Sequence, residues 1–221
     1  MKKLFLLALL AGSVSLASAQ KQAAGDKSLE VNFTPLGGSP ISINYIKLRS
    51  FTSEAQAYRL GVGLSMASSK TATGVTADGK TTMFDREATT NITLKPGIEK
   101  HMAGTSRLSP YMGAELDLAF QMHSVKSEYE ATPNSVETIT TKGTNGYMRI
   151  GANLLAGADY YVSNKLYLGT EIGFGLQFVN QSKIKTENSL SGAPAIDDQT
   201  QGSTFNIGPN FNGAIRLGFL F

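Results

Sequence analysis

The chain has 221 residues, of which 41% are hydrophobic, 17% are charged and 23 are glycine, with a formal net charge of +3. It has no cysteine, which excludes disulfide frameworks, thiolate metal sites, thiol nucleophiles and thioether-linked lipid anchors. Glycine exceeds its usual ~7% share and charge falls below the ~25% typical of soluble domains. The mean hydropathy of -0.09 does not resemble that of a helical membrane protein.

The N-terminal segment has the three-part layout of a secretory signal peptide. Two lysines precede an apolar run over residues 4–11, and small residues then lead to an Ala-Ser-Ala sequence that ends at Ala19. The run is too short to cross a ~30 Å hydrocarbon core as a helix, which disfavours an uncleaved anchor. We therefore predict a cleaved signal peptide at residues 1–19 and one mature domain at residues 20–221. Removal of the two lysines lowers the formal net charge to +1, so no basic stripe remains to bind nucleic acid.

The mature chain alternates apolar and polar residues with a period of two. This pattern predicts β-strands, because successive strand side chains point to opposite faces of the sheet. The last segment shows it most clearly, with Phe205, Ile207 and their successors alternating with polar or small residues. The pattern predicts eight strands, at residues 29–33, 41–45, 58–66, 91–99, 112–122, 147–156, 165–178 and 204–221.

The connections between these segments alternate short and long from the second one onward. The three long ones, residues 67–86, 124–143 and 180–202, are polar and carry no helical pattern. Short periplasmic turns and longer extracellular loops are typical of outer-membrane barrels. The sequence therefore predicts an all-β fold, an eight-stranded antiparallel up-and-down transmembrane β-barrel with short periplasmic turns, long extracellular loops and both termini in the periplasm.

A soluble lipocalin-like barrel is the alternative, with the apolar faces of the strands pointing inward. The polar face, however, is rich in glycine, asparagine and single charges of both signs, which fits a crowded interior better than a solubilising surface. The apolar face lacks charge over about 9–11 residues in the late strands, as a tilted membrane-crossing strand requires. The predicted interior polar network consists of Glu30, Arg59, Lys95, Glu99, Glu115, Asp117, Arg149, Asp159, Glu171 and Arg216.

Aromatic residues lie near the ends of the apolar runs, where interfacial girdles are expected. The predicted girdle residues are Tyr111, Phe120, Tyr160, Tyr161, Phe178, Phe205, Phe219 and Phe221.

The closing run at residues 213–221 alternates apolar residues and ends on an aromatic. With the signal peptide and the eight strands, it resembles the small eight-stranded outer-membrane β-barrels of Gram-negative bacteria. The general character of the sequence is similar to that of the OmpX-like or PorT-like barrels of Bacteroidota. The resemblance implies an outer-membrane location, contact with lipid and lipopolysaccharide, and a role in an outer-membrane complex as one option. It also implies an assembly signal for the barrel-assembly machinery, formed by Ile215, Leu217, Phe219 and Phe221.

Searching the sequence for catalytic chemistry gives largely negative results. His101 falls in a predicted periplasmic turn, whereas His123 adjoins Ser124 near the outer end of a strand. A resemblance to lipid A deacylases would need a His-Ser pair on the lipid-facing surface, but strict alternation points His123 inward. No nucleophile elbow, phosphate loop or zinc-protease motif occurs, and the acidic pair at 197–198 is more typical of a solvated tip than of a cation site. We therefore expect no enzyme activity, no cofactor and no metal.

Eight strands enclose an interior that side chains fill, so an open diffusion pore is disfavoured. We expect a plugged barrel that acts as a structural or interaction protein, through its extracellular loops or as an accessory subunit of an outer-membrane complex. An OmpW-like transporter of a small solute and a lipid-modifying enzyme are the alternatives.

Overall fold

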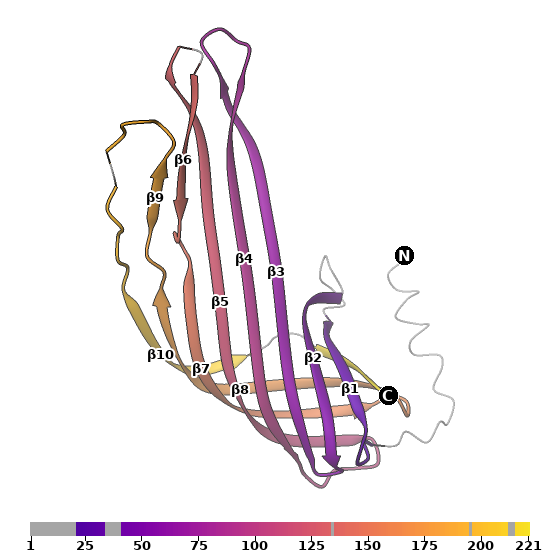
Figure 1. The fold of residues 1–221 in the computed structure, drawn as a ribbon. Coiled ribbons are helices and arrows are strands. Elements are labelled where there is room, and N and C mark those ends of the chain that lie inside the picture. The colour runs from indigo at the N-terminus through magenta and orange to yellow at the C-terminus, as the bar shows by residue number, and fades with distance from the viewer. Residues whose placement is uncertain (1–20, 34–40, 134, 195, 212–214) are drawn as a thin grey trace.

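The computed structural model describes residues 21–33, 41–133, 135–194, 196–211 and 215–221, and within them the chain is entirely β-structure and irregular segments (Figure 1). The predicted signal peptide lies outside the described residues. Among those residues there is no helix with the length and apolarity that a membrane crossing requires. The strands are β1 (Lys27–Phe33), β2 (Ile41–Ser53), β3 (Gln56–Val75), β4 (Thr82–His101), β5 (Leu108–Thr132), β6 (Ser135–Lys142), β7 (Tyr147–Tyr161), β8 (Leu166–Gln181), β9 (Lys185–Asn188), β10 (Ser203–Phe211) and β11 (Ile215–Leu220).

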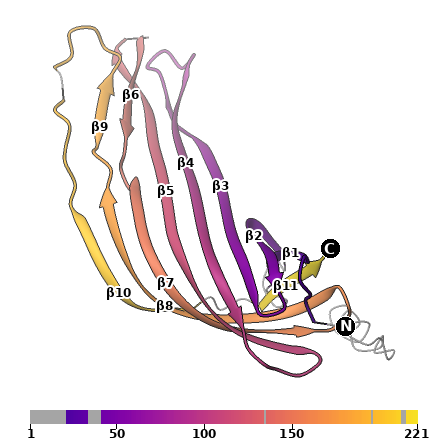
Figure 2. The ribbon, with the colours of Figure 1, turned by 60° about the horizontal axis from the view of Figure 1, so that its bottom comes forward.

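Eight of these strands close a ring by antiparallel pairing. In order around the ring they are β1, β2, β3, β4, β5, β7, β8 and β11, and β11 pairs again with β1. The two chain ends meet there, since the backbones of Lys27 and Phe221 exchange hydrogen bonds of 3.1 and 2.9 Å. Figure 2 shows β1, β2 and β11 beside the lower parts of the longer strands. We call this the lower end of the molecule.

Above the ring, the sheet continues as a tall open wall. β3 pairs with β2 only as far as Gly63 and then runs to Val75 beside β4 alone. At the opposite side, β10 pairs with β8 alone over Ser203–Phe211. Within the described residues, β3 and β10 therefore each present a long unpaired edge, and both views place them at opposite sides of the wall (Figures 1 and 2).

The upper hairpins differ from the expectation of irregular loops. Much of residues 67–86 and 124–143 is strand, and residues 180–202 contain β9. These segments are polar on both faces, so they lack the apolar alternation that marked the other strands. Threonine, which is frequent in these segments, favours strands even without that alternation, which explains the difference.

Two further boundaries differ from the prediction. β2 continues to Ser53, so the connection expected between the strands at residues 41–45 and 58–66 is reduced to residues 54–55. The expected strand at 204–221 is divided into β10 and β11, separated by residues 212–214, which lie outside the described residues.

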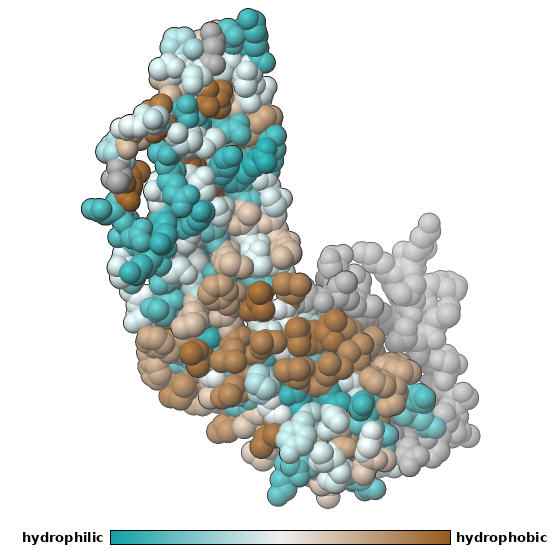
Figure 3. All heavy atoms as spheres, in the orientation of Figure 1, coloured by the Kyte–Doolittle hydropathy of each residue, from teal (hydrophilic) through white to brown (hydrophobic). Residues whose placement is uncertain are grey.

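The two faces of the strands differ sharply in chemistry. Large apolar side chains point outward and are exposed, among them Leu60, Leu94, Leu118, Leu154 and Phe174, while charged side chains point into the ring and are buried. Figure 3 shows the resulting apolar band across the middle of the visible face, with hydrophilic residues above and below it. This arrangement is the reverse of that of a soluble barrel.

The predicted aromatic girdle is wrong for two of its eight residues. Tyr111 and Tyr161 are fully buried inside the ring, whereas the other six predicted girdle residues are exposed or lie on the outer face. Tyr111 shares its face of β5 with Glu115, and Tyr161 shares its face of β7 with Asp159. These two tyrosines were assigned to the girdle because they lie near strand ends. Whether a side chain points inward or outward, however, is determined by the alternation along its strand.

Inward glycines make room for the large interior side chains. A Cβ atom at Gly218 would lie 2.0 Å from Cζ of Tyr167, and one at Gly61 would lie 2.0 Å from the Tyr45 hydroxyl. Each tyrosine therefore covers a glycine on a neighbouring strand. This close approach explains part of the high glycine content.

The outward position of Phe174 generates a stability prediction. If the apolar band faces lipid, Phe174→Arg lowers the free energy of unfolding by about 2–4 kcal/mol, because an arginine in mid-bilayer is poorly solvated. Urea unfolding in lipid vesicles measures the change. Val75→Arg is the matched control, since Val75 is 57% exposed and Phe174 54%, but Val75 lies at the far end of β3. Equal effects of the two substitutions would contradict a lipid-facing band.

Candidate functional site

The ring is filled by a cluster of buried ionic side chains, which we call the charged plug. Its four cations and four carboxylates all lie inside the lower end of the ring. Their side chains are at most 4% exposed, except for that of Glu171 at 12%. The plug consists of Glu30, Lys47, Arg49, Arg59, Glu99, Asp159, Glu171 and Arg216.

Arg49 lies at the centre of the plug. One guanidinium nitrogen donates to Glu99 at 2.9 Å and to Asp159 at 2.7 Å, while the other terminal nitrogen is paired with Glu30. The guanidinium also lies 5.0 Å from the ring centroid of Tyr167. Arg49 thus links carboxylates from β1, β4 and β7 across the interior.

Arg59 and Arg216 extend this network to the remaining strands. Arg59 is paired with Glu99 at 2.9 Å and with Glu171 at 2.8 Å. Arg216 is paired with Glu30 at 2.8 Å and with Asp159 at 3.1 Å. Each carboxylate therefore accepts from more than one cation, and these attractions offset the desolvation penalty of burying the charges.

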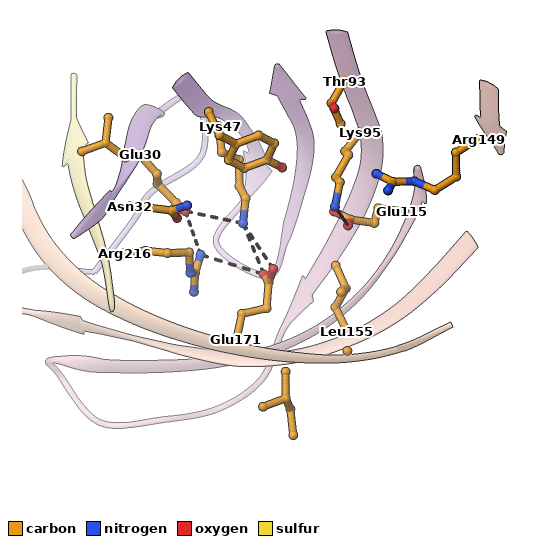
Figure 4. Close-up of a pocket in the computed structure, with 14 residues that line it drawn as sticks. Glu30, Asn32, Lys47, Thr93, Lys95, Glu115, Arg149, Leu155, Glu171 and Arg216 are labelled. Carbon is orange, nitrogen blue, oxygen red and sulfur yellow. Dashed lines mark hydrogen bonds and ion pairs between the residues drawn. The ribbon is translucent and has the colours of Figure 1, made fainter. Parts of the chain in front are cut away.

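Lys47 closes the upper side of the plug. Its ammonium nitrogen lies 3.3 Å from Glu171 and 3.6 Å from Glu30. Figure 4 shows Lys47, Glu30, Arg216 and Glu171 converging from different strands, joined by the marked interactions. These contacts form a continuous polar layer across the ring.

Aromatic and histidine side chains pack beneath and around the ion pairs. The Tyr167 hydroxyl lies 2.8 Å from Glu30, and the Tyr111 hydroxyl donates to Glu171. His101 lies between Ser109, at 2.9 Å, and Glu99, at 3.3 Å. His101 was expected in a periplasmic turn, but it is the last residue of β4 and its ring points into the plug.

The segment before β1 covers the lower mouth of the ring. Gln22, only 3% exposed, accepts from the Tyr161 hydroxyl at 2.9 Å and donates to Ser109 and to the Glu54 carbonyl, each at 3.0 Å. The backbone of Gly25 donates to the Phe51 carbonyl at 2.8 Å. The charged plug is therefore closed from below by polar contacts as well.

A second charged group, which we call the upper cluster, lies above the plug. Arg149 donates to Asp117 at 3.2 Å, and Glu115 is paired with Arg59 of the plug at 3.0 Å. Lys95 approaches both carboxylates but stays 3.7 to 3.8 Å away. The upper cluster consists of Lys95, Glu115, Asp117 and Arg149.

The structure places all ten residues of the predicted interior network in the plug or the upper cluster. Those ten comprise four cations and six carboxylates, a deficit of two positive charges. Lys47 and Arg49, which sequence reasoning missed, supply them. The deficit of two positive charges could have indicated that two further interior cations exist, because buried carboxylates need cationic partners.

The predicted assembly-signal residues lie on β11 and directly after it. Ile215, Phe219 and Phe221 are exposed and Leu217 is partly exposed, all on the apolar outer side. Their backbone pairing with β1 and β8 completes the ring.

The remaining candidates for chemistry are not assembled into a site. His123 is buried and bonds to Glu87 at 2.9 Å, while Ser124 follows it on the opposite face of β5. Among the described residues, no group of three or more metal-ligating side chains occurs.

The central position of Arg49 predicts a large effect of its removal. Arg49→Met leaves Glu30, Glu99 and Asp159 buried without their shared cation. We expect the free energy of unfolding to fall by about 3–5 kcal/mol, measured by urea titration in lipid vesicles.

An exposed ion pair gives the control for this prediction. Lys142 and Glu187 lie 3.1 Å apart on the upper hairpins, with side chains 52% and 63% exposed. Lys142→Met is expected to change stability by less than about 1 kcal/mol. A loss for Arg49→Met as small as this one would show that the plug is not the stabilising network described above.

Comparison with known proteins gives one match. The family model described as "Putative OmpA-OmpF-like porin family" matches residues 44–207. No curated protein and no solved structure matches the chain. The matched range runs from β2 to β10 and covers well over half of the sequence. The chain therefore belongs to the OmpA-OmpF-like porin family, a family of outer-membrane β-barrel proteins.

Proposed function

We propose that this chain is an eight-stranded, up-and-down outer-membrane barrel of the small OmpX-like or PorT-like type, with both termini in the periplasm. Tight connections join the strands at the lower end, at residues 54–55, 102–107 and 162–165, while tall hairpins rise at the other end. This asymmetry matches short periplasmic turns and long extracellular segments. The exposed apolar band supports contact with outer-membrane lipid and lipopolysaccharide, and the outward residues of β11 support recognition by the barrel-assembly machinery.

The charged plug is the observation that carries the functional proposal. It spans the ring with side chains that are almost completely buried, and Gln22 covers it from below. An eight-stranded ring has little interior space beyond its side chains. The protein therefore acts as a structural or interaction protein rather than as an open diffusion pore, because the plug blocks a route along the axis of the ring.

The edges of β3 and β10, which have no strand partner within the described residues, support an interaction role. Leu64 and Met66 on β3, and Phe205 and Ile207 on β10, are among the most exposed apolar residues. Backbone groups in a bilayer must find hydrogen-bond partners, so open edges at this depth require pairing. We infer that a strand of another outer-membrane protein pairs there, making this chain an accessory subunit of a complex.

We also propose that the protein is not an enzyme. The buried His123 ring is bonded to the exposed Glu87 of β4, and the neighbouring Ser124 lies on the other face of β5. A lipid-modifying dyad would need both groups on one lipid-facing surface.

Conductance tests the plugged-barrel proposal. Purified protein in planar bilayers is expected to show no reproducible discrete conductance steps. A variant carrying Arg49→Gly and Arg59→Gly removes two central plug side chains and is expected to conduct, provided that its heat-modifiable gel mobility shows a folded barrel. Discrete steps from the wild-type protein would overturn the proposal.

Site-specific crosslinking tests the interaction role. A photo-crosslinking residue in place of Met66 on the β3 edge is expected to capture a discrete outer-membrane partner in intact cells. Met112 is the control, because it is similarly outward-facing but its strand β5 is paired on both sides. Identical crosslinking from both positions, or none from Met66, would count against edge pairing.

A further inference from the structure

Three cations lie side by side on the outer face of the wall, and we call them the cation row. Lys70 on β3 pairs in register with Arg86 on β4, which pairs in turn with Lys126 on β5. These three strands rise next to one another in Figure 1, and all three residues are exposed. Neighbouring strands are about 4.8 Å apart, so the row brings three positive charges within about 10 Å across the sheet.

The cation row belongs to the same face as the apolar band. Along β5, the outward alternation runs from Leu118 through Met122 to Lys126, and along β4 it runs from Leu94 to Arg86. The rise per residue places Lys126 about 13 Å beyond Met122 along the strand, or about 10 Å in height at the usual strand tilt. Lysine and arginine side chains can also reach back toward the apolar surface. The row therefore lies at the level of lipid headgroups, directly above the band.

The row differs from the cations beside it, because those have partners. On the same face, Lys142 is paired with Glu187 at 3.1 Å, and Lys185 is paired with Asp198 at 3.3 Å. Within the described residues, no ion pair includes a member of the cation row. Like charges directly opposite each other destabilise a sheet. The row therefore favours an anion from outside the chain.

The nearby carboxylates are held by other groups. On this face of β3, β4 and β5, the acidic residues above the band are Glu128 and Glu130. Glu128 accepts from the backbone N–H of Phe84 at 3.1 Å, and Glu130 accepts from that of Ala77 at 2.9 Å. The Lys70 ammonium lies 3.4 Å from the centroid of the Phe84 ring, which fixes its position. Three cations thus face two carboxylates, and the charge at the row itself stays positive.

We propose that the cation row binds the phosphate groups of a phosphorylated glycolipid in the outer leaflet, while the acyl chains of the same lipid cover the apolar band. Row and band adjoin on one face, so a single amphiphile contacts both. Arginine can bind phosphate through two parallel hydrogen bonds, and lysine binds it as a point charge. The inference rests on the proposed outer-membrane location and orientation, and it adds a specific headgroup site to them.

Native mass spectrometry of the folded, detergent-solubilised protein tests this site with two lipids. Diphosphoryl lipid A carries phosphates and acyl chains, whereas its dephosphorylated form keeps the chains alone. We expect the phosphorylated lipid to bind about tenfold more tightly or better, less so in added salt because the contact is ionic. Excess inorganic phosphate is expected not to displace it, because free phosphate has no acyl chains.

The possible failures are distinguishable. Equal binding of the two lipids would overturn the phosphate site but leave the lipid contact of the band in place. Binding of neither lipid would contradict the proposed lipid contact as well. Displacement of lipid A by inorganic phosphate would show that the row takes a free anion, which contradicts a lipid headgroup as the ligand.

Matched variants locate the binding. A triple variant with Lys70→Gln, Arg86→Gln and Lys126→Gln is expected to weaken lipid A binding by about tenfold or more. It loses like-charge repulsion, so we expect it to fold, as heat-modifiable gel mobility would verify. Exchanging the cations, with Arg86→Lys and Lys126→Arg, keeps the charge and is expected to keep binding. Lys80→Gln, at an 82% exposed side chain in the hairpin turn, is the control and leaves binding unchanged. Unaltered lipid A binding by the folded triple variant would refute the site.

Discussion

The balance of buried charge inside the ring is the constraint on which the rest of the structure depends. Within the described residues, the plug and the upper cluster together hold six cations and six carboxylates. An unpaired ion in such an interior carries a penalty of several kcal/mol, so the arrangement holds only when every group has a partner. Each of the eight ring strands supplies at least one of these groups. Ring closure and charge pairing therefore depend on each other. β11 completes the ring and also brings Arg216 to Glu30 and Asp159.

The interior arginines and glycines together allow large polar side chains to fit inside a narrow ring. Arginine presents a planar fork of donors to several carboxylates at once, as Arg49 does toward β1, β4 and β7. A narrow ring has room for such side chains only where the neighbouring strand carries a glycine beside them. Gly169 meets this need, since a Cβ there would lie 2.6 Å from a terminal nitrogen of Arg216. The unusual glycine content is thus a consequence of filling an eight-stranded interior with large polar groups.

Much of the fold followed from the period-two pattern, because one face of each ring strand is apolar and the other polar. The pattern indicated the strands of the ring, their faces and ten interior charges. It failed where that contrast disappears: the hairpins beyond Ala67 are polar on both faces, so no periodicity marks them. It also failed at Lys47 and Arg49, because the predicted strand ended at residue 45, whereas β2 continues to Ser53. The edges of β3 and β10 could not be predicted, since sequence alternation does not tell which strands are neighbours.

A charged interior also explains how the register of such a sheet is specified. In a soluble barrel, burial of the apolar face favours one register, because a one-residue slip exposes that face to water. In a bilayer, the outer face is already in an apolar medium, and an apolar interior would leave the two faces nearly equivalent. With Arg59 on the inner face of β3, a one-residue slip would move a guanidinium into the outer apolar band, at a cost of about 2–4 kcal/mol for a mid-bilayer position. The same slip would leave Glu99 and Glu171 without that partner. The ion pairs thus distinguish inside from outside where hydrophobicity alone does not, which gives a physical reason for an ionic plug in place of an apolar core.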